Sequence, residues 1–333
     1  MARPTNVPPP RSGSEIAARL KIIFMGTPAL AAHILDRLAT QPDPRFSVVA
    51  VVTRPDEPRG RGLALAPSEV GAVAARHNLP ALKPVRIRTP EFLAEIKSYD
   101  PDLLVVAAYG RILPQPILDA AKLAPINVHA SLLPRFRGAA PIEGAILSGD
   151  RETGVTIMRI TAAMDSGPII LRRAIPITSD DTQGSLKSKL AELGAGALCD
   201  ALDLYARGSV VETPQDEALA TYTKQVGKED AVIDWSADAA QIERMTRAFD
   251  PWPVARTTLG GGPILLWRAR DLEDVQQSSA APGTLVVVKP EPIVRCGRGA
   301  LVLREVQAPG RKRMPAADFF NGRQVASGTR LGA

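Results

Sequence analysis

The sequence is poor in the residues that form disulfides and structural metal sites. It has 333 residues but only two cysteines, Cys199 and Cys296, which lie far apart and match neither a zinc-ligand spacing nor a disulfide framework. We therefore expect no bound metal and a reducing, cytoplasmic setting.

Long hydrophobic runs are absent too. The longest apolar stretches, such as Leu103 to Ala108, are far shorter than the roughly 20 residues that a membrane-spanning helix needs. The N-terminus carries no apolar signal core, and Pro8-Pro9-Pro10 opposes regular structure there. We expect a protein without membrane contact that begins with a disordered extension over residues 1–20.

The motifs of several large enzyme classes are missing as well. Gly26-Thr27-Pro28-Ala29 follows an apolar run but lacks the further glycines that let a helix approach a pyrophosphate. The chain contains neither a glycine-rich loop ending in Lys-Ser or Lys-Thr nor Gly-x-Ser-x-Gly. These absences argue against NAD binding, nucleoside triphosphate hydrolysis and α/β-hydrolase chemistry.

What the first two thirds of the chain does contain is an alternation of apolar runs and helical patterns. Such an alternation is typical of a Rossmann-like, mostly parallel sheet covered by helices, which we expect over residues 21–207. We predict strands at 21–26, 47–53, 103–108, 126–130, 155–160 and 169–175, and helices at 67–77, 90–97 and 182–206.

The pattern changes after residue 207. Residues 208–221 are polar and predict a linker, and residues 222–333 contain one helical pattern at 237–248 followed by short β-like runs, which predict a small β-barrel. Residues 275–333 contain nine Lys or Arg and three Asp or Glu, a net charge of +6. That excess indicates either a polyanionic partner or a solvated surface. The β-like runs are 254–258, 264–268, 283–288, 293–295 and 301–306.

The best candidates for chemistry are Asn127 and His129, at the end of an apolar run. Side chains two residues apart in a strand project to the same face, and open α/β sheets usually bind ligands where their strands end. With Asp165 in a turn, an amide and a protonated imidazole would stabilise an oxyanion during acyl transfer. On spacing alone, a buried structural histidine and a turn-forming aspartate are equally good interpretations.

A set of motifs in one order resembles the 10-formyltetrahydrofolate-dependent formyltransferases. The central motif is Asn127-Val-His-Ala-Ser-Leu-Leu-Pro-Arg-Phe-Arg-Gly-Ala-Ala-Pro-Ile142, whose second half resembles the branch of the family that acts on initiator tRNA. The resemblance covers roughly Lys21 to the C-terminus. The other motifs are Phe24-Met-Gly-Thr-Pro28, Val52-Thr-Arg-Pro-Asp56, Gly60-Arg-Gly62, Tyr109-Gly-Arg-Ile-Leu-Pro114, Glu152-Thr-Gly-Val-Thr156, Met164-Asp-Ser-Gly167 and Ala248-Phe-Asp-Pro-Trp-Pro253.

The resemblance implies roles for residues at the predicted sheet edge. Asn127, His129 and Asp165 fall on the family's catalytic triad. The residues implied to surround the pterin and formyl group of 10-formyltetrahydrofolate are Ser131, Leu132, Leu133 and Pro134, together with Arg111, Ile112 and Leu113.

The resemblance also implies contacts with tRNA. Arg59 and Arg61 lie in a glycine-rich loop of the kind that approaches the tRNA acceptor end, although Leu63, Ala64 and Leu65 stand where family members often carry lysines. The C-terminal region resembles the family's OB-like domain. Its densest basic cluster, which is either a phosphate contact or a solvated turn, is Arg311, Lys312 and Arg313.

The implied reaction is transfer of the formyl group to the α-amino group of methionine esterified to initiator tRNA, by a monomer. The core motif alone equally fits an amino sugar nucleotide, glycinamide ribonucleotide or water as acceptor. The glycine-rich basic loop and the basic C-terminal region favour tRNA. A catalytically silent RNA-binding module is disfavoured by the intact Asn127, His129 and Asp165.

Overall fold

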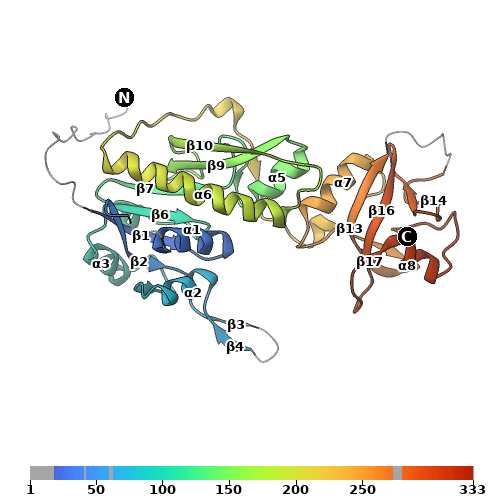
Figure 1. Cartoon of the computed structure of the whole chain (residues 1–333), viewed down its shortest axis with the longest axis horizontal. Helices are drawn as coiled ribbons and strands as arrows, with labels where there is room; N and C mark the ends of the chain where they lie inside the picture. The colour runs from blue at the N-terminus through green and yellow to red at the C-terminus, as the bar shows by residue number, and fades with distance from the viewer. Residues whose placement is uncertain (1–18, 41–42, 60–62, 273–279, 333) are drawn as a thin grey trace. The chain divides into compact units, whose positions relative to one another are not determined.

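The computed structural model describes residues 19–40, 43–59, 63–272 and 280–332 (Figure 1). These residues divide into two compact units. The first takes its residues from Met1–Arg137, Gly154–Ala174 and Ser188–Thr221, and the second from Gly138–Thr153, Ile175–Lys187 and Tyr222–Ala333. Most of the expected N-terminal extension, residues 1–18, lies outside the described residues. Strand β1 already begins at Leu20, so the expected boundary is wrong by one residue.

The first unit is built on a mostly parallel sheet, as predicted. Strand β1 pairs in parallel with β2 and β6, β2 with β5, and β6 with β7, whereas β9 runs antiparallel to β7. Across the sheet the order is β10 (Ile169–Pro176), β9 (Glu152–Arg159), β7 (Ala124–His129), β6 (Leu103–Ala107), β1 (Leu20–Gly26), β2 (Phe46–Val52) and β5 (Ala81–Leu82).

Helices cover this sheet and explain its continuous apolar strands. Every residue of β6 is buried, as expected for a strand with both faces covered. On one face, Phe92 and Ile96 of α3 join the sheet residues Ile23 and Leu104 in a single apolar cluster. The helices of this part of the chain are α1 (Ala29–Thr40), α2 (Glu69–Arg76), α3 (Pro90–Ser98), α4 (Gln115–Leu118) and α6 (Gln183–Ala206).

Helix α6 approaches the sheet closely at one glycine. A Cβ atom at Gly194 would lie 3.2 Å from Val128 of β7 and 3.5 Å from Ile34 of α1. Figure 1 shows α1 and α6 on the same side of the sheet. The glycine therefore sets how near α6 lies to the strand that carries the candidate site.

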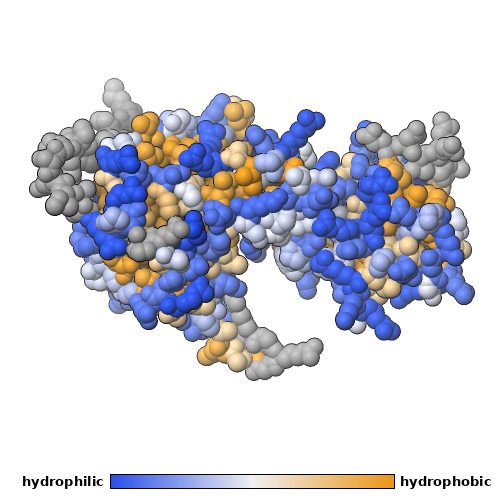
Figure 2. Space-filling model, viewed as in Figure 1, coloured by the Kyte–Doolittle hydropathy of each residue, from blue (hydrophilic) through white to orange (hydrophobic). Residues whose placement is uncertain are grey.

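The first unit also contains a β-hairpin that was not predicted from the sequence. Its strands, β3 (Glu57–Arg59) and β4 (Ala64–Ala66), pair antiparallel. Leu63 and Leu65 are each 72% exposed, and Figure 2 shows hydrophobic atoms at this end of the molecule.

The second unit contains an antiparallel sheet, in agreement with the prediction of a separate β-rich domain. The C-terminal residues bridge both edge strands, because Leu331 pairs with Leu259 and Arg330 with Thr284. The sheet therefore closes on itself. Its strands are β12 (Arg256–Leu259), β13 (Gly262–Leu272), β16 (Ala300–Gln307), β15 (Ile293–Arg295) and β14 (Leu285–Val287) in that order, with β17 (Met314–Pro315) beside β16.

Two of the helices of the second unit, at 239–248 and 316–322, contribute side chains to one core. Trp235 is buried in that core and donates from Nε1 to Thr257 Oγ1 at 2.9 Å. Helix α7 was predicted; α5 and α8 were not. Their bounds are α5 (Pro141–Ser148), α7 (Ala239–Ala248) and α8 (Ala316–Gly322), and the remaining short elements of the chain are β8 (Arg137–Gly138), β11 (Tyr222–Thr223) and the 3₁₀ helices η1 (Glu217–Leu219) and η2 (Glu229–Ala231).

Within the described ranges, no helix is long and apolar enough to span a bilayer.

Candidate active site

His129 is the last residue of β7, at the carboxyl end of a parallel strand. Its neighbour β6 runs in the same direction and ends at Ala107. The loops that follow these two strands therefore lie at one edge of the sheet. This is the edge where ligands bind in open α/β folds.

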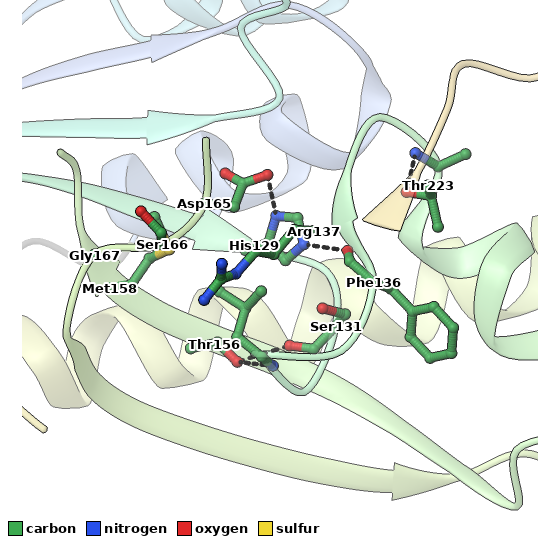
Figure 3. A network of polar contacts seen from close by, with 12 residues as sticks. His129, Ser131, Phe136, Arg137, Thr156, Met158, Asp165, Ser166, Gly167 and Thr223 are labelled. Carbon is green, nitrogen blue, oxygen red and sulfur yellow. Dashed lines mark hydrogen bonds and ion pairs between the residues drawn. The ribbon is translucent and has the colours of Figure 1, made fainter. Parts of the chain in front are cut away.

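Both ring nitrogens of His129 face oxygen atoms (Figure 3). Nε2 lies 2.9 Å from the Phe136 carbonyl oxygen, and Nδ1 lies 3.7 Å from Asp165 Oδ2. A carbonyl oxygen can only accept, so the proton of the neutral ring belongs on Nε2. The Asp165 carboxylate oxygen faces the other ring nitrogen, Nδ1. With 6% of its surface exposed, the ring is held in a nearly dry environment.

Asn127 lies two residues before His129 on the same strand. It pairs in register with Val106 of β6 and Met158 of β9, and it is half-buried. Strand alternation places its side chain on the same face as His129. The structure thus brings the two predicted polar residues to one side of the sheet.

Asp165 lies in a tight turn between β9 and β10. Its φ of 48° is in the left-handed region, which is uncommon for residues other than glycine. Gly167 is required two residues later, because a Cβ there would overlap the Arg159 carbonyl oxygen. The turn brings the carboxylate to His129 from a sequence distance of 36 residues.

The residues after His129 form a turn that several hydrogen bonds hold in place. Thr156, opposite His129 on β9, donates from Oγ1 to the Ser131 carbonyl at 2.7 Å and accepts from Leu133 N at 3.1 Å. The Ser131 hydroxyl donates to the Arg135 carbonyl at 2.6 Å. Leu133 is fully buried with Met158 and Ile169.

These contacts determine which groups of the turn remain available to bind a ligand. The Ser131 hydroxyl and the Leu133 side chain are used within the protein, so a ligand would meet backbone at these two positions. Leu132 is half-buried, and Pro134 follows a cis peptide bond.

The second predicted ligand segment follows β6. Arg111 donates from Nη1 to the carbonyls of Pro84 and Val85, at 3.0 and 3.1 Å, so its guanidinium fastens a loop. Ile112 is 81% exposed, whereas Leu113 packs against the apolar cluster under β6. An exposed apolar side chain beside backbone polar groups suits a flat heteroaromatic ring.

A buried arginine near the site escaped the sequence analysis. Arg137 is 1% exposed, and its guanidinium donates to Glu217 at 2.9 and 2.8 Å and to Gln215 at 3.1 and 2.8 Å. The hydrogen bonds from Arg137 lower the pKa of Glu217. These partners lie in the segment predicted as a linker, whose Thr213 also exchanges two backbone hydrogen bonds with Ile169. Side-chain and backbone hydrogen bonds therefore hold this segment against the rest of the first unit.

The predicted RNA-binding residues have different surroundings. Arg59 is the last residue of β3, and Arg61 lies outside the described residues. Arg311 and Lys312 are exposed in the turn before β17. Arg313 differs from them, because its guanidinium lies over the Trp267 ring and contacts Asp250 Oδ1 at 3.3 Å.

No cluster of three or more His, Cys, Asp or Glu side chains is arranged for a metal ion in the part of the chain that the structure describes.

Two family models match consecutive parts of the chain. The model described as "Formyl transferase" matches residues 19–202, and the model described as "Formyl transferase, C-terminal domain" matches residues 225–324.

Relatives resemble the chain along nearly its whole length. A protein from Roseiflexus sp. (strain RS-1) is 46% identical over 313 residues, which are 94% of this chain and 95% of the relative. One from Geobacter sulfurreducens is 44% identical over 316 residues, covering 95% and 98%. Both are named methionyl-tRNA formyltransferase.

Solved structures show the same fold at low identity. HypX from Aquifex aeolicus, in complex with tetrahydrofolic acid, is 19% identical with a TM-score of 0.60, and the match covers 93% of this chain and 48% of HypX. An N-formyltransferase from Helicobacter canadensis, in complex with folinic acid and dTDP-3-aminofucose, is 14% identical with a TM-score of 0.63, covering 85% and 98%.

Proposed function

This chain belongs to the formyl transferase family, and on that premise we propose that it transfers the formyl group of 10-formyltetrahydrofolate to the α-amino group of methionyl initiator tRNA. The product is N-formylmethionyl-tRNA, used to initiate translation. The observation that carries the proposal is the similarity to methionyl-tRNA formyltransferases over both units, at 44 to 46% identity.

In the proposed reaction the neutral amine attacks the formyl carbon. The new C–N bond forms first and gives a tetrahedral oxyanion; the bond from carbon to N10 of the folate then breaks, and one proton passes from the amine to N10. Asn127 and protonated His129 stabilise the oxyanion that develops on the formyl oxygen. Because Nε2 of His129 is engaged by the Phe136 carbonyl, Nδ1 is the nitrogen available to the reacting atoms. Asp165 orients the ring and assists the proton transfer.

The formyl donor would lie along the two loops at the carboxyl edge of β6 and β7. Ile112 and Leu132 supply apolar contact to the pterin. Backbone groups around Ser131, Leu133 and Pro134 read its polar edge. Arg111 and Leu113 would hold the loop that follows β6 in place. Arg111 does so by donating to the Pro84 and Val85 carbonyls.

The acceptor tRNA would use basic residues of both units. We assign Arg59 of β3 and the nearby Arg61 in the sequence to its acceptor end, and Arg311 and Lys312 to its phosphate backbone. Arg313 would support this surface by holding Trp267 and Asp250. Phosphate contacts of this kind position an RNA without reading its sequence. We further propose that the enzyme acts as a monomer in the cytoplasm.

The test is a comparison of acceptors with one donor. Purified protein is mixed with radiolabelled 10-formyltetrahydrofolate and methionyl initiator tRNA, methionyl elongator tRNA or a dTDP-amino sugar. We expect formylation of initiator tRNA at a kcat/KM at least 10²-fold above that of the amino sugar. Preferred formylation of the sugar would overturn the proposed acceptor and leave the donor chemistry in place.

A further inference from the structure

One segment of the first unit contacts both residues that face the His129 ring. It comprises Thr213–Thr221, which we name the strap. Near its start, Gln215 contacts the turn that carries Asp165, and at its end Thr221 contacts Phe136. Asp165 and Phe136 are the partners of Nδ1 and Nε2 of His129.

Gln215 has its amide oriented by a buried charge. Its Oε1 accepts from Arg137 Nε and Nη2, and its Nε2 donates to the carbonyls of Asp165 at 2.8 Å and Gly167 at 2.7 Å. A guanidinium can only donate, so the oxygen of the amide must face Arg137. The NH₂ group must then face the turn. Glu217 balances the Arg137 charge, which makes this orientation stable in a buried site.

The turn needs this support because its conformation is unfavourable. A non-glycine residue at positive φ is strained and persists only where its surroundings impose it. Asp165 has a φ of 48°. Gln215 binds the carbonyls of Asp165 and Gly167, on either side of Ser166. Without those two donors, the turn would be held by fewer hydrogen bonds, and the Asp165 carboxylate would shift relative to His129.

The other end of the strap holds the acceptor of Nε2. Thr221 Oγ1 accepts from Phe136 N at 2.8 Å, and the Thr221 carbonyl accepts from Arg137 N at 2.8 Å. Phe136 also has a positive φ, of 59°. Its carbonyl is thereby presented to His129 at 2.9 Å.

We propose that the strap aligns His129 from both sides, and that Gln215 is a positioning residue that acts through Asp165. The catalytic consequence rests on the proposed function, since it is measured as formyl transfer. The geometric consequence does not, since the state of the His129 ring can be measured without substrate.

The decisive variant is Gln215→Glu, which keeps an acceptor for Arg137 and removes both donors to the turn. We expect kcat for initiator tRNA to fall 10- to 100-fold, KM values to stay within about twofold, and the pH profile of kcat to shift. In an Asp165→Ala background, Gln215→Glu should change kcat by less than about twofold, because the residue through which it acts is gone.

Thr257→Val is the control. Thr257 Oγ1 accepts from the buried Trp235 Nε1 at 2.9 Å in the second unit. This variant should lower the unfolding temperature through the lost hydrogen bond and leave kcat within about twofold. A Gln215→Glu variant with wild-type kcat, or with a lower kcat and an unchanged pH profile, would overturn the proposal.

An NMR measurement separates this proposal from the proposed function. The ¹⁵N signals of the His129 ring, followed from pH 5 to 9 without substrate, should change in Gln215→Glu in the same direction as in Asp165→Asn. Unchanged signals would contradict the positioning role even if the enzyme formylates tRNA. Changed signals would support it even if tRNA is not the acceptor.

Discussion

At the residue scale, the chemistry depends on which atoms surround one imidazole. His129 is buried between a carbonyl that accepts from Nε2 and a carboxylate that faces Nδ1. The carbonyl belongs to Phe136, whose role no sequence pattern indicates.

Burial without a charged partner has a different effect at Cys296. This side chain is fully buried in the core of the second unit, and burial raises the pKa of its thiol to about 12. The folded state therefore favours the neutral thiol. The resulting stability is complete below the pKa of the unfolded chain, near 9, and is lost as the pH rises toward 12.

We predict that Cys296→Ala weakens the alkaline sensitivity of the second unit. Between pH 9 and 10.5 the wild type should lose about 1.4 kcal/mol per pH unit more of its unfolding free energy than the variant. The variant has a constant deficit from its cavity, so the comparison is between slopes. Urea unfolding at several pH values measures this, and parallel slopes would contradict it.

The sequence predicted those site residues that lie close together along the chain better than those that lie far apart. Asn127 and His129 are two residues apart in a strand, so alternation alone brings them together. Asp165 is a turn aspartate whose spacing fits a structural role equally well, and the resemblance to a family placed it in the triad. Gln215 and Arg137 are 78 residues apart, and no periodic pattern relates positions so distant. Their pairing depends on where the strap crosses the sheet edge, which only the folded chain determines.

At the element scale, the predicted elements were those with strong patterns. Buried strands such as β6 and long helices such as α6 were predicted with one end wrong by a single residue. Helix α5, the β3–β4 hairpin and α8 were missed. Helix α5 has only eight residues with an apolar character all around, so no amphipathic period distinguishes it. The hairpin strands have three residues each, too few to show alternation.

Two glycines of α6 allow a test of how this helix packs. A side chain at Gly194 would press on Val128, whereas nothing lies within 4 Å of a Cβ at Gly196. We predict that Gly194→Val destabilises the first unit by about 1–3 kcal/mol through overpacking. Gly196→Val should change stability by less than about 0.5 kcal/mol, because valine is a slightly better helix former than glycine. Thermal or urea unfolding measures both, and equal effects would refute this packing.

At the scale of the whole molecule, the excess positive charge lies in the C-terminal region to which we assign contacts with the tRNA backbone. The chain has a formal net charge of +6, and residues 275–333 alone carry a net +6, so the rest of the chain is neutral overall. A basic C-terminal region suits a large polyanionic acceptor. A small acceptor would not need it.

We predict that replacing Arg311 and Lys312 together by alanine weakens tRNA binding and its dependence on salt. Loss of two phosphate contacts should reduce the slope of log K against log salt by roughly 1.5. Arg298→Ala removes one positive charge that is already paired with Asp238 at 2.6 Å, and it should leave the slope nearly unchanged. Filter binding from 50 to 200 mM salt measures the slopes. If the double variant and the wild type showed equal slopes, Arg311 and Lys312 would not contact the tRNA phosphates.

The central claim is that His129 stabilises the transition state of formyl transfer to methionyl initiator tRNA. The most direct measurement is single-turnover formylation with excess wild-type enzyme or His129→Ala, at saturating 10-formyltetrahydrofolate. We predict that the variant binds both substrates and transfers the formyl group about 10²- to 10⁴-fold more slowly. A variant that formylates the tRNA at a near-normal rate would contradict the account.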